Sequence, residues 1–199
     1  MKKMNSMKRY ALVAMVLCLT TAFVACGNDD EEKIDTKTLA DVNGSYTGTM
    51  SVLGSRQDVT ATVSSSTVTF ANFPVTPLIA LVLQDEEAAA GIAQQLGNFG
   101  YNAKFAPVFN DDKTAIELTF TPDPINIAYA PVPTLPDAKA TVKVTIAAPE
   151  KGSYTYTGGK LSFALSVSKI ELTKPMTDEP EEVPLPAITL SFDLIQAAE

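Results

Sequence analysis

The sequence predicts a mainly β fold of the α+β class, in which an antiparallel sheet of about 9–10 strands forms a sandwich or a strongly curved, barrel-like structure. The main observation is that apolar and polar residues alternate with a period of two over most of the chain after residue 43. The second is that one segment, at about residues 76–97, departs from this period and has the spacing of a helix. A parallel, doubly wound sheet would need a helix between most pairs of strands, so a single helical segment argues against that class.

The first three strands are expected between residues 44 and 74. The first two form a hairpin around a turn at Gly54-Ser55, and the third follows a serine loop at residues 64–66 and ends near Phe73-Pro74. The apolar positions that alternate along these strands are Tyr46, Met50, Val52, Val59, Ala61, Val63, Val68 and Phe70.

The helical segment has start and stop signals at its two ends. Thr76 is the expected N-cap with Pro77 at the first helical position, and Gly97 is the expected stop. A polar interruption near Asp85 leaves open whether there is one helix or two short ones. We expect its apolar stripe to cover an open face of the sheet; a membrane-surface helix is disfavoured because the polar face is acidic rather than basic. The stripe consists of Leu78, Leu81, Val82, Ala89, Ile92, Ala93 and Leu96.

Strands are expected again from Tyr101 onward, with a turn at residues 110–113. Residues 122–136 contain five prolines, which lack the backbone donor of a central strand, so this stretch is expected to be an edge strand or an extended crossing. A hairpin is expected around a two-residue turn at Gly158-Gly159. An acidic, proline-containing loop at residues 173–186 then leads to a last strand at 188–194.

The strand at residues 160–172 changes phase. Its apolar residues lie at odd positions up to Val167 and at even positions from Ile170. Because successive side chains point to opposite faces of a sheet, a shift of one residue predicts a β-bulge or a sharp bend, here at Ser168-Lys169.

One face of the predicted sheet is strongly apolar. A helix of about 20 residues can cover only about two strands, so the sheet must bury the remainder by folding onto itself. The space between helix and sheet is either filled by side chains or forms a cavity for an apolar small molecule. The apolar face is formed by Ile116, Leu118, Phe120, Leu161, Phe163, Leu165, Ile188, Leu190 and Phe192.

Residues 1–25 have the features of a secretory signal peptide. Basic residues precede an apolar run at residues 10–19, which is shorter than the about 20 residues that a transmembrane helix needs. Residues 23–26 (Phe-Val-Ala-Cys) resemble the lipobox of bacterial lipoproteins, which implies cleavage before Cys26 and attachment of lipid to its sulfur. The alternative is an ordinary signal peptide in which Cys26 is incidental.

Residues 26–42 are expected to form an acidic tether, and residues 43–199 a single β-rich domain. Blocks of like charge repel one another and keep the chain extended. The tether is either a charged spacer or, by its resemblance to the surface-export signal of Bacteroidetes lipoproteins, a signal that places the domain on the outside of the outer membrane. The carboxylates concerned are Asp29, Asp30, Glu31 and Glu32.

The charge of the chain restricts its partners. Removal of residues 1–25 takes away four of the 15 basic residues and none of the 23 acidic ones, which moves the formal net charge from −8 to −12. Such a protein lacks the basic face that nucleic acids require and the attraction to anionic lipids that a basic patch would supply. We therefore expect no nucleic-acid partner and attachment to the membrane through the lipid on Cys26.

The lipobox, the tether, the first-strand motif at residues 44–48 (Gly-Ser-Tyr-Thr-Gly) and the aromatic-proline step at residues 70–74 together resemble a family of Bacteroidetes lipoproteins that carries the domain of unknown function DUF4840. The first-strand motif is also similar to that of calycin-like barrels from the same bacteria. The resemblance implies a lipoprotein but supplies no functional residues, because the family has no assigned activity.

The composition excludes most catalytic chemistry. The chain contains no histidine, which removes Ser-His-Asp and Cys-His nucleophile systems and histidine metal sites, and its one mature cysteine is expected to carry the lipid. Paired carboxylates of the kind that glycosidases use remain, but the acidic residues at 85–87, 111–112 and 178–182 lie in polar settings. The sequence therefore predicts a protein that is not an enzyme and needs no cofactor or metal.

Two functions remain. The first is a non-catalytic binding module at the outer membrane or cell surface, with an apolar small molecule or a glycan as ligand. Because the chain contains no tryptophan, stacking against a glycan would fall to Tyr101, Tyr129, Tyr154 or Tyr156. The second is a structural or assembly subunit of a surface complex or fimbria-like structure, which a missing or exchangeable edge strand would indicate.

Overall fold

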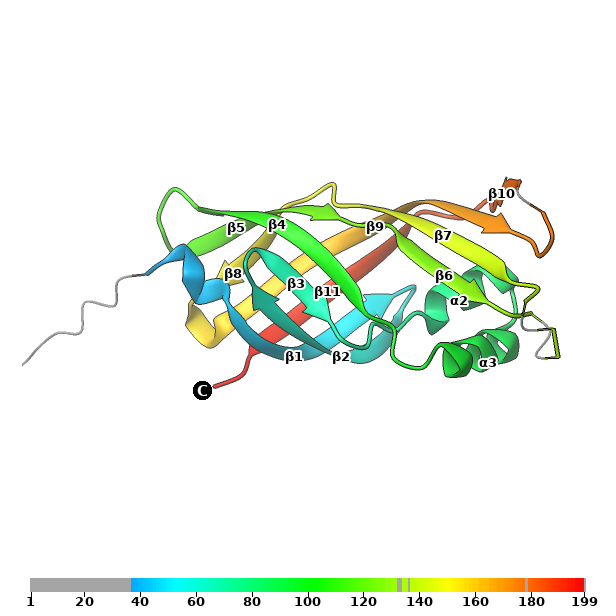
Figure 1. Ribbon diagram of the computed structural model, residues 1–199. Coiled ribbons are helices and arrows are strands. Elements are labelled where there is room, and N and C mark those ends of the chain that lie inside the picture. The colour runs from blue at the N-terminus through cyan, green and yellow to red at the C-terminus, as the bar shows by residue number, and fades with distance from the viewer. Residues whose placement is uncertain (1–36, 132–133, 136, 178, 199) are drawn as a thin grey trace, which may run out of the picture. The chain divides into compact units, whose positions relative to one another are not determined.

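The strands of the protein form an antiparallel sheet that closes into a barrel (Figure 1). We describe it from a computed structural model for residues 37–131, 134–135, 137–177 and 179–198. Within this part of the chain, the eight barrel strands are β1 (Gly44–Val52), β2 (Ser55–Ser64), β3 (Thr67–Phe70), β4 (Tyr101–Phe109), β5 (Ala115–Pro122), β8 (Gly152–Thr155), β9 (Lys160–Thr173) and β11 (Ile188–Gln196). The predicted β-rich fold is confirmed. Of the two architectures that the sequence left open, a sandwich and a barrel, the structure has the barrel.

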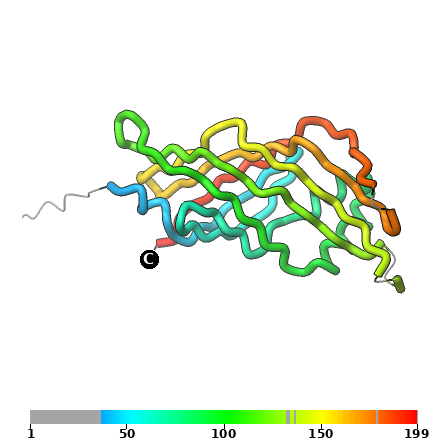
Figure 2. Tube along the Cα trace, turned by 45° about the horizontal axis from the view of Figure 1, so that its top comes forward, coloured from blue at the N-terminus to red at the C-terminus, as the bar shows by residue number. Residues whose placement is uncertain are grey.

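The barrel is closed by its last strand. Strands β1 to β5 pair antiparallel in chain order and form five of the eight strands of the wall, with the helical segment inserted between β3 and β4. β11 then pairs antiparallel with β1 on one side and with β9 on the other. Figure 2 shows β11, in red, between these two strands. Closure pairs the strand edges that a sandwich would leave open.

The sheet continues beyond the barrel because β9 is longer than the strands beside it. The first half of β9 pairs with β11, and its second half pairs with β7 (Ala140–Ala147) and with the short β10 (Pro180–Glu182). β6 (Ile125–Tyr129) pairs with β7 alone among the described residues, which confirms an edge strand in the proline-rich stretch. Residues 173–186 were expected to form only a loop, but they contain β10, whose backbone pairs with β9. Two ion pairs, Lys174–Glu181 and Lys169–Glu182, also join β10 to β9 and to the turn between the two strands.

The predicted bulge in β9 is confirmed. Ile146 pairs with Val167 and Thr145 with Lys169, so Ser168 is the extra residue. The Ser168 hydroxyl donates a hydrogen bond to the carbonyl oxygen of Thr145 at 3.1 Å. The inserted residue turns Ile170 inward, where 1% of its surface is exposed.

The helical segment consists of two helices, α2 (Thr76–Leu83) and α3 (Glu86–Leu96), which are inserted between β3 and β4 and pack on each other, with α3 beside β6 (Figure 1). The chain breaks at Gln84, whose φ is 55°, and Asp85 caps α3. The stop at Gly97 is confirmed. The predicted N-cap is wrong by one residue, because Thr76 is already helical and Val75 occupies the cap without a side-chain hydrogen bond. Leu78, Ile79, Ala89 and Ile92 are the buried residues of the two helices.

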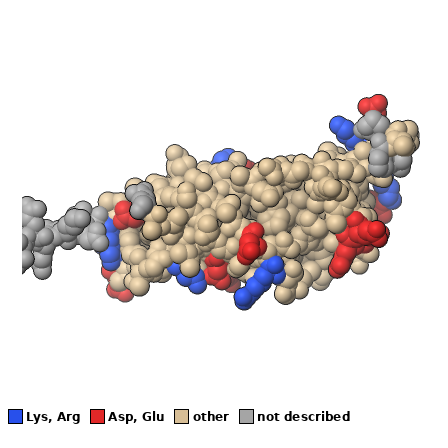
Figure 3. Space-filling model, turned by 90° about the horizontal axis from the view of Figure 1, so that it is seen from below, with Lys and Arg blue, Asp and Glu red and all other residues tan. Residues whose placement is uncertain are grey.

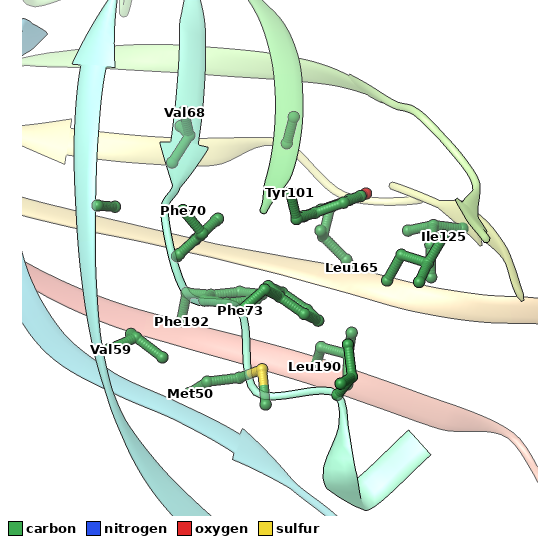
Figure 4. Packing of buried hydrophobic residues seen from close by; sticks show 14 of the residues in the cluster. Met50, Val59, Val68, Phe70, Phe73, Tyr101, Ile125, Leu165, Leu190 and Phe192 are labelled. Carbon is green, nitrogen blue, oxygen red and sulfur yellow. The ribbon is translucent and has the colours of Figure 1, made fainter. Parts of the chain in front are cut away.

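Side chains fill the interior of the barrel (Figure 4). All nine residues of the predicted apolar face are buried. Phe120, Phe163 and Phe192 stack with ring centroids 4.5 Å apart at each step, and Phe70 continues the series 5.3 Å from Phe192. The rings occupy the space in which an apolar ligand of a hollow barrel would lie.

The end of the barrel at which the described chain begins is tied together by Gln196. Its amide nitrogen donates to the carbonyl oxygens of Asp41 and Asn43, at 3.2 and 2.7 Å, and its amide oxygen accepts from the Tyr154 hydroxyl at 2.9 Å. These bonds hold the 3-10 helix η1 (Leu39–Val42) against the barrel, with Val42 in the core. Immediately before β1, the chain therefore forms a short 3-10 helix that is bound to the barrel.

The connection between β8 and β9 also differs from expectation. Thr155 pairs with Lys160, so four residues, not two, connect the strands, and they include the 3-10 turn η2 (Thr157–Gly159). Gly158 and Gly159 both have positive φ, at 78° and 54°. A side chain on Gly159 would collide with Gln196, which explains why the longer connection still needs glycine there.

Candidate functional site

The residues that the sequence predicts as functional lie before the folded unit. Cys26, the expected lipid attachment site, and the carboxylates Asp29, Asp30, Glu31 and Glu32 are outside the described residues. Among the residues that are described, no helix has both the length and the apolar character needed to cross a membrane.

The acidic residues of the domain are largely spread over its surface. Six carboxylates on or beside the strands form ion pairs with lysines 2.6–3.7 Å away: Glu117, Asp123, Glu171, Glu181, Glu182 and Asp193. Hydrogen bonds from Lys160 and Ser162 lower the pKa of Asp193. In the described ranges, no three carboxylates or cysteines come close enough together to hold a metal ion.

A surface groove lies where the β1–β2 turn faces α2. We call it the hairpin groove; its volume is about 630 Å³. It is lined by Val52, Leu53, Ser55, Gln57, Thr76, Pro77, Ala80, Leu81, Gln84, Asp85 and Glu86. It combines apolar side chains of the hairpin and of α2 with amides and carboxylates at the end of α2.

A second groove, of about 460 Å³, lies between α3 and the end of β6, and we call it the α3 groove. It is lined by Leu83, Asp85, Ala88, Gly91, Ile92, Gln95, Tyr129, Ala130 and Pro131. Asp85 lines both grooves, so the α2–α3 junction separates them. We refer to the two together as the junction grooves.

Hydrogen bonds hold the junction in place. The Asp85 carboxylate accepts from the backbone N–H of Ala88 at 3.0 Å, which caps α3, and the Gln84 amide donates to the carbonyl oxygen of Leu81 at 2.6 Å. Glu86 and Glu87 follow in the first turn of α3, where negative charge is stabilised by the helix dipole. Acidic side chains are visible at this end of the fold in Figure 3.

The rim of the hairpin groove carries an exposed leucine in an unfavourable conformation. Leu53 and Gly54 form the two-residue turn of the β1–β2 hairpin with φ of 49° and 83°, the signs that a type I′ turn requires. Leucine at positive φ costs about 1 kcal/mol relative to glycine, and 59% of the Leu53 surface is exposed. Leu53 lies outside the hydrophobic core, so core packing does not explain why a leucine occupies this turn position.

The tyrosines do not present rings for stacking at one site. Tyr46, Tyr101 and Tyr154 are buried, and burial raises the pKa of each. Their hydroxyls donate to Val42, Asp123 and Gln196. Tyr156 lies at the Lys37 end, with the Lys37 ammonium 4.7 Å from its ring. Tyr129 alone lines a junction groove, and its ring is buried.

The sequence contains only weak signals for the junction grooves. The polar break near Asp85 marks the junction, but the partners across the grooves, the β1–β2 turn and the end of β6, come from distant parts of the chain. The sequence predicts the first turn at Gly54-Ser55, one residue later than the observed turn at Leu53-Gly54, so it does not identify Leu53.

Comparison with known proteins identifies a family and no close relative. No curated protein and no solved structure matches the chain. The family described as "Domain of unknown function (DUF4840)" matches residues 41–172. The match covers more than half of the chain and all the barrel strands except the last residue of β9 and the closing strand β11. The chain therefore belongs to the DUF4840 family.

Proposed function

We propose that this protein is a lipid-anchored protein of the outer membrane, displayed at the cell surface, and that it acts as a non-catalytic binding module. The observation that carries the binding role is the pair of junction grooves that share Asp85. The anchoring role rests on the lipobox at residues 23–26, and the surface location on the acidic stretch at residues 29–32.

The position of the grooves in the domain supports this proposal. The folded unit begins at Lys37 at one end of the barrel, and the two helices lie at the other end (Figure 1). A lipid on Cys26 would attach the domain through its Lys37 end. The junction grooves are then at the end of the barrel that the attachment does not use.

An assembly subunit is the alternative, and two features count against it. The barrel closes on itself through β11, so it has no missing strand for a partner to supply. Its edge strand β6 has five residues and is bounded by Pro124 and Pro131, which cannot donate backbone hydrogen bonds. Short, proline-bounded edges resist pairing with other chains.

Photo-crosslinking in the native host tests the proposal. A photoreactive amino acid replaces Gly91, where an added Cβ meets no atom within 4 Å, and separately Asp112 in the β4–β5 turn, which lies outside both grooves. We expect a discrete adduct from position 91 and none from position 112.

Detergent phase partitioning tests the lipid anchor. The wild-type chain should partition into the detergent phase, whereas Cys26→Ala should remain in the aqueous phase.

Two results would contradict this proposal. Equal adducts from positions 91 and 112 would mean that the grooves have no special role. Aqueous partitioning of both the wild-type chain and Cys26→Ala would exclude the lipid anchor.

A further inference from the structure

Tyr129 lines the α3 groove, and its hydroxyl has no protein partner among the described residues. The residue is 7% exposed and lines this groove. The hydroxyls of the other four described tyrosines all donate to acceptors in the protein, at 2.7–3.4 Å, whereas the Tyr129 hydroxyl has no partner among the described residues. Because Tyr129 lines the α3 groove, its hydroxyl can bond a ligand that enters there.

The charge around the junction is negative. Asp85, Glu86 and Glu87 are exposed and adjacent, and within the described part of the chain none of them forms an ion pair. The residues that line the two grooves include acidic side chains but neither lysine nor arginine. Arg56 is the basic residue nearest in sequence to the hairpin turn. Its charge contributes to the lowered pKa of Asp193, which is not a lining residue of either groove. No positively charged side chain among the lining residues would therefore repel a cationic ligand.

The form of the grooves indicates an extended ligand. They lie on either side of the junction, so a ligand that occupies both must pass over Asp85. Gln57 and Gln84 line one groove and Gln95 the other. Each amide offers a donor and an acceptor, which matches the groups of a peptide backbone. Leu53 adds an exposed apolar contact at the rim.

We propose that the junction grooves bind an extended, positively charged peptide segment of a partner protein. This inference rests on the proposed binding function and names the partner's chemistry. Lysine or arginine side chains of the segment face Asp85 and Glu86, and a polar group of the segment bonds the Tyr129 hydroxyl. A glycan fits less well, because no tyrosine ring is free to stack in either groove, and the negative rim opposes an anionic membrane.

A fluorescence titration tests the inference. The chain contains no tryptophan, so the emission of one tryptophan in a short peptide reports binding without background from the protein. The probe is an eight-residue peptide in which lysine alternates with leucine and glycine around that tryptophan, and its partner probe has glutamate in place of every lysine. Both are titrated with the full chain in non-ionic detergent micelles, and micelles alone supply the blank. We expect saturable binding of the lysine peptide only.

Matched variants locate the binding. D85N with E86Q removes two charges and retains the cap of α3, since asparagine caps as well as aspartate; it should weaken binding about fivefold, as expected for two exposed charge contacts. D111N with D112N removes the same charge from the β4–β5 turn and should change affinity by less than about twofold. Tyr129→Phe should weaken binding about threefold, the effect of one lost hydrogen bond.

Several results would overturn the inference. These are equal binding of the two probes, equal effects of the two charge-removing double variants, or an unchanged affinity in Tyr129→Phe. If the lysine probe fails while the crosslink from position 91 persists, the grooves bind a ligand that is not cationic. In that case the inference falls and the proposed binding function stands.

Discussion

At the scale of single residues, the first-strand motif marks the closure of the barrel. Tyr46 is 1% exposed, and its hydroxyl donates to the Val42 carbonyl oxygen at 2.7 Å. Gly48 lies where β11 crosses closely: a Cβ there would collide with the carbonyl oxygen of Asp193 and lie 2.8 Å from the Cα of Leu194. The motif therefore combines an anchor for η1 with a position that only glycine can occupy.

Gly48→Ala is expected to destabilise the fold by about 2–4 kcal/mol, because backbone atoms of β11 cannot move aside without breaking strand pairs. Gly91→Ala is the matched control. An added Cβ there meets no atom within 4 Å, so replacing a helical glycine should stabilise the protein by about 0.5–1 kcal/mol. Urea denaturation followed by circular dichroism measures both. A Gly48→Ala chain as stable as wild type would refute the close approach of β1 and β11.

At the scale of elements, β9 connects the barrel to its extension, and Ser168 sets the phase of the strand between the two. Before the bulge, Leu165 faces the core, and after it Ile170 does. Both halves have fixed partners, β11 for the first and β7 for the second. One extra residue is the smallest change that lets both halves turn their apolar side chains inward.

Deletion of Ser168 is therefore expected to unfold the protein or to cost more than about 3 kcal/mol, because one half of β9 must then turn its apolar side chains to solvent. Ser168→Ala keeps the residue count and loses only the exposed hydrogen bond to Thr145, so it should cost about 0.5–1 kcal/mol. Thermal unfolding of the two chains separates the effects. Similar stabilities would show that the bulge does not set the phase.

At the scale of the whole molecule, stability should depend on the tyrosines at high pH. Burial raises the pKa of Tyr46 and of Tyr101 well above the ordinary value, and Asp123 adds to the effect at Tyr101. The unfolded chain loses these protons near pH 10 while the folded chain retains them, so stability is fully present below about pH 10 and falls as the pH rises further.

We expect the free energy of unfolding to change little between about pH 6 and 9, since no histidine titrates there. Above about pH 10 it should fall by about 1.4 kcal/mol per pH unit for each of the two tyrosines. Urea denaturation at pH 7, 9 and 11 measures the fall, and Tyr101→Phe should reduce its slope. Unchanged stability at pH 11 would show that the two phenols are not buried as described.

The sequence by itself determined the β-rich class, the position of most strands, the two ends of the helical segment to within a residue, and the bulge at Ser168. Each of these follows from local alternation of apolar and polar residues, because the buried face of a strand or helix is recorded in its own sequence. The tertiary structure alone decided that the sheet is a barrel, that β9 continues into an extension, and that the junction grooves exist. These depend on pairings between residues distant in sequence, such as Gln196 with Asn43 and the β1–β2 turn with α2. Local periodicity gives the face that a strand buries but not the strand that it pairs with, so closure and the grooves had to come from the fold.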